Sequence, residues 1–321
     1  MLANRIFAAK ADNGVNDASA AAAVPGGAWL VTGATGGVGQ FLLERMAASG
    51  EPAIALSRDP PAGPTAGAIA WLRGDLQHAS PPVAAGPVRV LSAGPLDAFS
   101  RWASRAAWPA GTRIVALSSM SATTKLDQAH PSERAVAEAL LAAEGALQAL
   151  CPARGWSLVL LRPTLVWGRG DRSITPLLAL ASRLRALPLP SGSRGRRQPV
   201  HADDLAAAML AAMHDEAVGT GPWPAGGGEV LGFDEMLARS LRAAGVRGRL
   251  LRLPDLLARP VEALAARLPG VPGRMASQMS RARRDLDVDD RRIWERLGLD
   301  PRGFRPGADA FPGLGRRPES P

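Results

Sequence analysis

The sequence predicts an α/β protein built on a doubly wound parallel β-sheet, followed by a small, mainly helical C-terminal domain. Two observations carry the sheet prediction. From Ala28 to about Met213, short apolar runs alternate with stretches of helical periodicity. Near the start of this region, an apolar run enters a loop with glycines at three fixed offsets, and a helical pattern follows at once. Alternation at this rhythm is typical of βαβ units with helices on both faces of a parallel sheet.

The elements follow from the lengths of these runs. The first strand is predicted at residues 28–32 and its helix at 37–49, where apolar side chains recur at helical spacing. Five further short apolar runs are predicted to be strands: 52–56, 68–73, 88–92, 113–118 and 157–162. A long helix is expected at 132–150, with Ser132 as its N-cap and Glu133 favourable in its first turn. Further helices are expected at 176–186 and within 200–214.

Composition limits the class of protein. The chain has 321 residues, of which 46% are hydrophobic, enough for a large core. Its single cysteine, Cys151, excludes a disulfide framework and is typical of a reducing compartment, so we expect a cytoplasmic protein. No uncharged apolar run reaches about 18 residues, and we therefore expect no membrane span.

The positive charge is concentrated late in the chain. The formal net charge is +9, and residues 239–321 hold 18 arginines and 10 acids. A basic face suits nucleic acid, an acidic membrane surface or a phosphorylated ligand. Arginine dominates over lysine throughout and aromatics are few, which favours compositional bias, and we predict no nucleic-acid partner. The leucine-rich residues 250–268 are interpreted as a helix pair of a small domain, with a helix on a membrane surface as the alternative.

The glycine loop indicates a phosphate ligand. Such a loop lets backbone approach a pyrophosphate, whose charge then lies on N–H groups at a helix N-terminus. An ordinary glycine-rich turn is the alternative, but the order strand, loop, helix favours a nucleotide. The residues expected to hold it are Gly33, Thr35, Gly36, Gly37, Val38 and Gly39.

The end of the second strand bears on the choice of cofactor. It reads Ser57-Arg58-Asp59, without the carboxylate that accepts from the ribose 2′-OH of NAD at this place. An arginine favours the 2′-phosphate of NADP. We therefore predict contacts from Ser57 and Arg58 and a preference for NADP, with NAD as the alternative cofactor and a surface arginine as the alternative role for Arg58.

Five blocks, in order, resemble the NAD-dependent epimerase/dehydratase branch of the extended short-chain dehydrogenase/reductase superfamily. They are residues 31–39, 74–76, 117–119, 161–168 and 197–206. The resemblance implies a Rossmann-type fold and contacts from Asp75 and Leu76 to the adenine. It further implies that Ser92, Ala93 and Pro163 contact the cofactor, and that long helices pair in a homodimer.

The chain departs from this family where the family performs its chemistry. A Tyr-x-x-x-Lys pair normally supplies the acid and base, and here its positions fall on Val136 and Leu140. Substitutes are expected among the serines after the fifth strand and the histidine before the long helix: Ser118, Ser119, Ser121 and His130. The alternatives are turn hydrogen bonds for the serines and a helix-entry role for His130.

The residues expected to contact the substrate agree only in part with those of sugar-nucleotide enzymes. Arg197 matches an arginine that contacts the diphosphate in sugar-nucleotide enzymes of the family, and Arg194 adds a donor, although a solvated basic loop is the alternative. Leu165 stands where those enzymes often carry a substrate-binding asparagine. His201 and Asp204 resemble a structural pair, and we predict no metal site because histidine and cysteine have no ligand spacing.

The sequence thus predicts this organisation: a disordered extension at 1–26, a dinucleotide-binding domain at 27–215 with 169–197 on the substrate side, a small domain at 216–310 and a loose tail at 311–321. The predicted function is an NAD(P)-binding epimerase, dehydratase or reductase that acts on a nucleotide-sugar or small carbonyl through a non-standard proton relay. The alternative is an inert NADP(H)-binding sensor or assembly module.

Overall fold

The computed structural model describes residues 15–17, 23–61, 68–126, 131–171, 173–254 and 282–314. It divides into two compact units. Unit 1 comprises Met1–Pro163, Asp203–Ala225 and Asp290–Leu299, and unit 2 comprises Thr164–Ala202, Gly226–Asp289 and Asp300–Pro321. The sequence predicts a division after residue 215, with 169–197 on the substrate side, whereas the chain passes between the units several times. Each unit is therefore described by itself.

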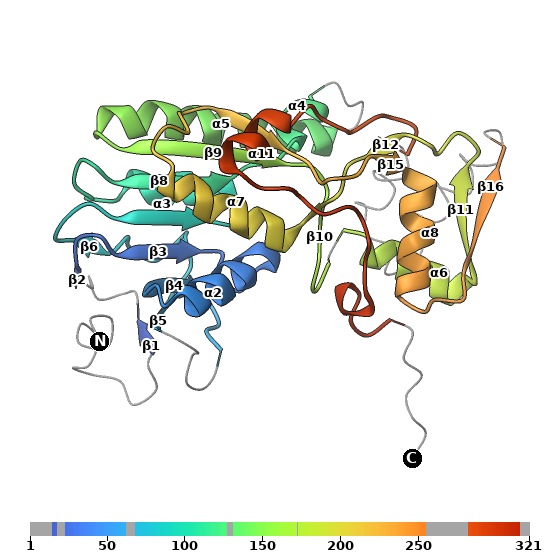
Figure 1. The fold of residues 1–321 in the computed structure, drawn as a ribbon, viewed down its shortest axis with the longest axis horizontal. Helices are drawn as coiled ribbons and strands as arrows, with labels where there is room; N and C mark the ends of the chain where they lie inside the picture. The colour runs from blue at the N-terminus through green and yellow to red at the C-terminus, as the bar shows by residue number, and fades with distance from the viewer. Residues whose placement is uncertain are drawn as a thin grey trace, which may run out of the picture. The chain divides into compact units, whose positions relative to one another are not determined.

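Unit 1 contains an eight-stranded sheet in which every neighbouring pair is parallel. In spatial order its strands are β1 (Val15–Asp17), β5 (Ile69–Arg73), β4 (Ala53–Ser57), β3 (Trp29–Thr32), β7 (Arg89–Ser92), β8 (Arg113–Leu117), β9 (Ser157–Pro163) and β14 (Pro222–Ala225) (Figure 1). The order reverses between β3 and β7, as in doubly wound nucleotide-binding sheets. The predicted fold class is confirmed.

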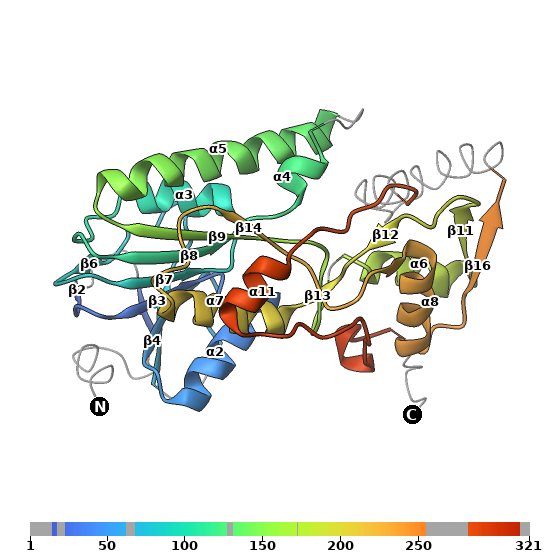
Figure 2. The same cartoon turned by 45° about the horizontal axis from the view of Figure 1, so that its top comes forward.

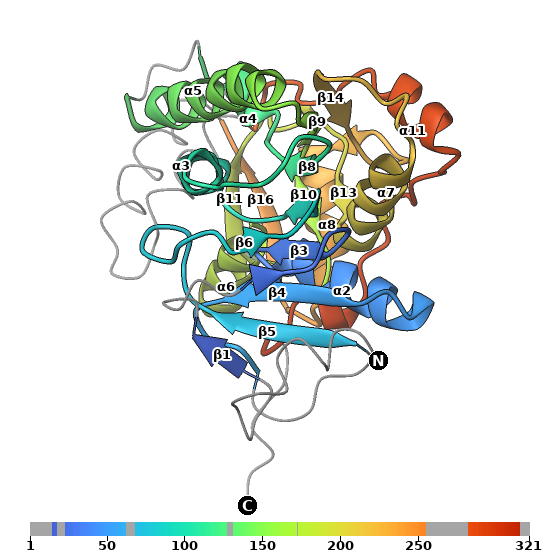
Figure 3. The ribbon, with the colours of Figure 1, turned by 90° about the vertical axis from the view of Figure 1, so that its left-hand side faces the viewer.

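Helices cover both faces of this sheet. α3 (Leu96–Ser104) and α5 (Pro131–Ala153) lie on one face, and α2 (Gly37–Ser49) and α7 (Ala202–His214) lie on the other (Figures 2 and 3). Unit 1 also has two shorter helices. α4 (Ser121–Thr124) follows β8, and α11 (Arg291–Leu297) lies in the last segment of the unit. Because both faces are covered, β3, β4 and β8 are buried at every position.

The core under α3 and α5 is rich in tryptophan. Trp102 packs edge-on against Trp108 with ring centroids 5.4 Å apart, and Trp108 lies 5.4 Å from Trp156. The indole N–H groups of Trp108 and Trp156 donate to the carbonyls of Pro82 and Trp108. These bonds satisfy the indole N–H groups of Trp108 and Trp156, whereas that of Trp102 is buried without a hydrogen-bond partner among the described residues.

Helix α5 is the one described helix that is long and apolar enough to cross a membrane by length and composition. In unit 1 it lies on the sheet and contributes Ala143, Leu147 and Cys151 to the core. The core helix of a folded domain passes the same test, so this finding is weak evidence for a span.

Unit 1 contains strands that the sequence does not predict, near its N-terminus and at β14. Residues 15–17 and 23–24, expected in a disordered extension, form β1, which pairs with β5, and β2 (Ala23–Val24), which pairs with β6 (Val83–Ala84). At the other edge, β14 contains Pro222 and Pro224. Prolines two residues apart lack N–H groups on the same side, which an outer strand that pairs only with β9 tolerates.

Unit 2 contains two helices and three small sheets among its described residues. The helices are α6 (Thr175–Leu184) and α8 (Phe233–Ala243), and η1 (Ala308–Ala310) is a 3₁₀ turn. The two-stranded pairings are β10 (Val166–Trp167) with β13 (Val200–His201), β11 (Ala186–Pro190) with β16 (Arg249–Leu253), and β12 (Arg196–Arg197) with β15 (Leu231–Gly232). Its core gathers around Leu178, Phe233 and Phe304. Leu250–Leu253 lie in a strand rather than in the predicted helix pair, and 255–268 fall outside the described residues.

Candidate functional site: a dinucleotide loop in unit 1

The glycine loop joins β3 to α2 so closely that side chains are excluded at two positions. Gly33 has a φ of +69°, and a Cβ built on it would lie 2.4 Å from the backbone nitrogen of Gly94. A Cβ on Gly39 would lie 2.1 Å from the carbonyl oxygen of Gly33. Glycine is therefore required at both positions, one for the turn and one for the packing of helix against strand.

The outer side of the same loop is open. Gly36 is the N-cap of α2, with no side-chain cap and no acidic residue in the first turn. Thr35 and Gly37 are exposed, and a Cβ on Gly37 would meet no protein atom within 4 Å. The N–H groups of the first turn thus face an open space beside a helix N-terminus. This arrangement fits the pyrophosphate of a dinucleotide, as the spacing predicts.

Two arginines lie together at the carboxyl ends of β4 and β5. Ser57 pairs in register with Arg73, and Arg73 Nη1 donates to the carbonyl oxygen of Arg58 at 3.3 Å. Both arginines are exposed. The Ser57 hydroxyl lies 3.4 Å from that of Thr35 in the glycine loop and accepts the Asp59 N–H at 3.2 Å. The segment 57–59 therefore lies beside the glycine loop, which it contacts through the hydroxyls of Ser57 and Thr35.

Asp75 begins the turn after β5. One carboxylate oxygen accepts the N–H groups of Gln77 at 2.7 Å and His78 at 2.8 Å, and the other lies 2.9 Å from His78 Nδ1. The His78 side chain, above all, lowers the pKa of Asp75 to about 2. Asp75 is thus an ionised acceptor near neutral pH. The next residue, Leu76, is half-buried and packs against the core.

The other predicted cofactor residues lie at the ends of β7 and β9 and in the first turn of α2. Ser92 is fully buried and accepts the Thr32 hydroxyl at 3.0 Å. Ala93 is half-buried and donates its N–H to the Thr32 carbonyl at 2.9 Å. Pro163 is buried at the end of β9, where its carbonyl accepts the Met120 N–H at 2.9 Å. Val38 is buried in the first turn of α2. The contacts of Ser92 and Ala93 with Thr32 hold the start of the glycine loop against β7.

The three candidate serines after β8 have different surroundings. The Ser118 hydroxyl is buried and donates to the Glu144 carboxylate. Ser119 is half-buried, and its oxygen accepts the Ser121 N–H at 3.1 Å. Within the described residues the Ser119 hydroxyl makes only this bond, which leaves its hydrogen available to a ligand. Ser121 is also half-buried. The structure thus gives Ser118 a packing role and leaves Ser119 and Ser121 as candidates for contact with a ligand.

Glu144 fixes the register of α5 against the sheet. Its carboxylate accepts Arg162 Nε at 2.9 Å and also pairs with Arg162 Nη2, and both side chains are largely buried. Val136 and Leu140 lie about two turns and one turn before it on α5. Val136 is 43% exposed, whereas Leu140 is half-buried against the core. His130, the remaining catalytic candidate, lies outside the described residues.

The predicted substrate arginines lie in unit 2. Arg197 is buried, and its Nη1 donates to the carbonyls of Arg196 at 2.8 Å and Arg284 at 2.6 Å. Its guanidinium stacks 4.9 Å from the Phe233 ring. Arg194 is exposed, and its Nε lies 3.9 Å from Asp234. Arg197 therefore packs in the interior of unit 2, whereas the Arg194 side chain is exposed to solvent.

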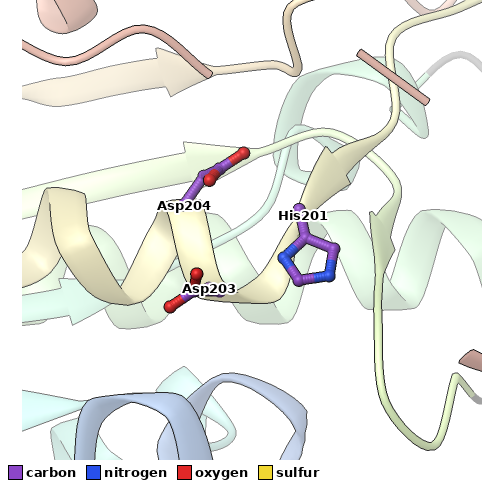
Figure 4. Close-up of side chains that lie close together, drawn as sticks. All are labelled: His201, Asp203 and Asp204. Carbon is purple, nitrogen blue, oxygen red and sulfur yellow. The ribbon is translucent and has the colours of Figure 1, made fainter. Parts of the chain in front are cut away.

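His201, Asp203 and Asp204 come together where β13 leads into α7 (Figure 4). One potential ligand atom of each lies within 4.8 Å of the others. The Asp203 carboxylate is paired with Arg45 Nε at 2.6 Å, and the His201 ring packs edge-on at 4.5 Å against Trp167. The packing of His201 agrees with the structural role predicted for it, and an acidic cluster of this kind carries no metal assignment.

Two residues of the site were not predicted from the sequence. Gly94 belongs to it because Gly33 approaches its backbone, and the run of small residues Ser92-Ala93-Gly94 after a strand is the signal that could have identified it. Arg73 belongs to it through the register between β4 and β5. No sequence pattern reveals that register.

Comparison with known proteins agrees with the fold. Residues 96–222 match the NAD dependent epimerase/dehydratase family. A curated relative, ceramide reductase from Caulobacter vibrioides, is 28% identical over 247 residues, which are 71% of this chain and 74% of the relative.

Solved structures share the fold. MoeE5 in complex with UDP-glucuronic acid and NAD has a TM-score of 0.60 at 20% identity, covering 89% of this chain and 97% of that one. The epimerase Mth375 from Methanothermobacter thermautotrophicus has a TM-score of 0.62 at 16% identity, covering 89% and 91%. Thermus thermophilus UDP-glucose 4-epimerase in complex with NAD has a TM-score of 0.57 at 16% identity, covering 89% and 97%. The chain thus shares the fold of these structures, and its residues 96–222 are similar to the NAD dependent epimerase/dehydratase family.

Proposed function

We propose that this protein is an NADP-dependent reductase that converts a carbonyl group to a hydroxyl on an apolar substrate. The observation that carries the proposal is the pair Val136 and Leu140 on α5, at the positions where the resembled family has its tyrosine and lysine. The relative named ceramide reductase supports reduction and an apolar substrate of the ceramide type.

Loss of that pair weighs more on epimerisation than on simple reduction. The group that takes the proton of a hydroxyl during oxidation is the group that returns it during reduction. An epimerase that oxidises its substrate and reduces it again needs this proton transfer twice in each turnover, whereas a reductase needs it once. A site without the tyrosine and lysine therefore fits a reductase better than an epimerase.

The substrate side favours an apolar molecule over a nucleotide-sugar. Arg197 is buried and its Nη1 donates to two backbone carbonyls within unit 2, so this arginine offers little to a diphosphate. Leu165 stands where sugar-nucleotide enzymes of the resembled family often have an asparagine. Val136 and Leu140 add apolar surface on α5.

The cofactor expected at the glycine loop is NADP. Arg58 and Arg73 place two exposed guanidinium groups at the carboxyl ends of β4 and β5, where a 2′-phosphate would be neutralised. The first turn of α2 would hold the pyrophosphate. Bound NADPH supplies the hydride that forms the new C–H bond. The Ser119 hydroxyl donates its proton to the carbonyl oxygen and recovers one from water.

The test combines binding and turnover. Purified protein is titrated with NADPH and NADH, and then mixed with NADPH and either a keto-analogue of ceramide or a panel of nucleotide-sugars. We expect NADPH consumption with the ketone, and transfer of deuterium from labelled NADPH to the product carbon. Sugar products without reduction of the ketone would contradict the proposal.

The second candidate is a binding module that senses NADP(H) or assists assembly. The same two apolar positions favour it, since they remove the usual acid and base. NADPH binding with no turnover on either substrate class would support it. Pairing into a homodimer and a location in the cytoplasm remain predictions of the sequence.

A further inference from the structure

The basic excess of unit 2 includes a group of arginines that its acids do not neutralise. Several arginines of this unit are paired, Arg196 with Asp285 and Asp287, and Arg239 with Glu229 and Glu235. Four exposed arginines differ, because within the described residues their guanidinium groups have no hydrogen-bond or ion-pair partner. They are Arg183, Arg185, Arg247 and Arg249.

These four arginines lie on adjoining elements. Arg183 and Arg185 are at the end of α6, and the Arg249 N–H donates to the Arg185 carbonyl at 3.2 Å. Gly248 brings the next segment against α6, since a Cβ on it would lie 3.0 Å from the carbonyl oxygen of Ala181. β11 and β16 then run parallel from this point (Figure 1).

Two exposed leucines are interleaved with the arginines. Leu184 is 52% exposed at the end of α6, and Leu251 is 47% exposed on β16. Leu251 lies on the same face of β16 as Arg249, because side chains alternate along a strand, whereas Leu250 packs against the core. We call the six residues the Arg–Leu rim: Arg183, Leu184, Arg185, Arg247, Arg249 and Leu251.

Arg185 also occupies a backbone conformation that usually belongs to glycine. It has a φ of +54° and is the one described non-glycine residue with a positive φ. In the same chain α2 and α11 end at Gly50 and Gly298, with φ of +73° and +63°. An arginine at this position carries a conformational cost that a glycine would avoid.

We propose that the Arg–Leu rim docks unit 2 on an anionic lipid bilayer. Arginines attract anionic headgroups, and the leucines between them bury in the interfacial region. Nucleic acid would satisfy the arginines but would leave both leucines in water, and the rim has no aromatic ring on which a base could stack. A second copy of the rim would repel the first. The inference is independent of the proposed reductase activity.

The test is sedimentation with vesicles of phosphatidylcholine alone and of equal parts phosphatidylcholine and phosphatidylglycerol. We expect binding to the mixed vesicles, at least about tenfold tighter than to phosphatidylcholine and weakened by salt. Arg183→Glu/Arg249→Glu should reduce it at least about tenfold. The matched control is Arg291→Glu/Arg292→Glu, the same charge change at exposed residues of α11 in unit 1. Leu184→Ser/Leu251→Ser should weaken the binding that persists at high salt.

Three results would overturn the proposal. They are no sedimentation with mixed vesicles, equal loss in the two charge-reversal variants, and tighter binding to a single-stranded RNA homopolymer than to vesicles at the same salt. Circular dichroism checks that each variant is folded. NADPH titration of the same samples separates this outcome from failure of the proposed function, because the rim variants should bind NADPH as the wild type does.

Discussion

Arg162 Nε donates to a carboxylate oxygen of Glu144 at 2.9 Å, and its Nη2 pairs with the other oxygen, which makes the ion pair bidentate. The pair ties α5 to β9, and the Ser118 hydroxyl adds a donor from the end of β8. Glu144 thereby determines which residues of α5 lie one and two turns earlier. Those residues are Leu140 and Val136. The assignment of the missing lysine and tyrosine to these two positions is therefore supported by the Glu144–Arg162 ion pair as well as by the residue spacing.

Removal of the Glu144 charge should strongly destabilise unit 1. Glu144→Gln leaves the largely buried Arg162 guanidinium without a counter-charge, at an expected cost of about 3–5 kcal/mol in the free energy of unfolding. Glu138→Gln on the exposed side of the same helix should change it by less than about 0.5 kcal/mol. Urea unfolding followed by circular dichroism measures both. Similar losses in the two variants would contradict the role of the ion pair.

Much of unit 1 could be predicted from the sequence because its strands are short, apolar and separated by helical patterns. β3, β4, β5, β7, β8 and β9 lie within one or two residues of the predicted strands. β14 was missed because Pro222 and Pro224 argue against a strand, and only its place at the sheet edge makes them acceptable. β1 was missed because its three residues carry no strand pattern, and its pairing with β5 determines its structure.

The candidate site was predictable where one local segment builds it. The glycine offsets, together with the strand before them and the helical pattern after them, predict the loop and the start of α2. Gly94 and Arg73 enter through contacts between distant segments, with Gly33 and with Arg58, and no local pattern encodes them. Arg197 is a further example of contacts between distant segments. Its motif predicts a substrate contact, and only the fold of unit 2 reveals that the side chain is buried with Nη1 on the carbonyls of Arg196 and Arg284.

A methyl group at Gly37 should weaken dinucleotide binding without loss of stability. The Cβ of Gly37→Ala meets no protein atom within 4 Å, but it would occupy the open side of the loop where a pyrophosphate approaches. We expect the dissociation constant for NADPH to rise at least about tenfold. The control is Gly145→Ala on α5, where a Cβ also meets nothing, and which should add about 0.5–1 kcal/mol of stability. Unchanged NADPH binding in Gly37→Ala would place the cofactor elsewhere.

Reversal of charge at Arg58 should discriminate between the two cofactors. Loss of a charge-assisted contact to the 2′-phosphate costs about 1.5–3 kcal/mol, which is about 10- to 100-fold in affinity for NADPH. Arg58→Asp should therefore bind NADPH that much more weakly, and NADH almost unchanged. Arg73→Ala should show a smaller shift of the same kind. Arg291→Asp, on exposed α11, controls for net charge. An equal loss of both cofactors would refute the 2′-phosphate role.

The single thiol should report on unfolding. Burial raises the pKa of Cys151 to about 12, whereas an unfolded thiol titrates near about 8.5. The folded state therefore holds the proton, and this contribution to stability is present below about pH 8.5 and is lost as the pH rises toward 12. At about pH 8.5 a disulfide reagent should label the protein only at the rate of opening, and quickly in urea. Cys151→Ser is the blank, and rapid labelling of the folded protein would contradict the buried environment.

Restoring the acid and base should accelerate the chemistry, and oxidation of the alcohol is the convenient direction in which to measure it. Val136→Tyr/Leu140→Lys places a phenol and an ammonium one helical turn apart on α5, in register with Glu144. If these positions face the cofactor, oxidation of the alcohol product with NADP should gain about 10²-fold or more and should rise with pH as the phenol ionises. Val136→Phe/Leu140→Met keeps the approximate size without proton chemistry. Equal rates for the two double variants would show that this part of α5 does not reach the reacting atoms.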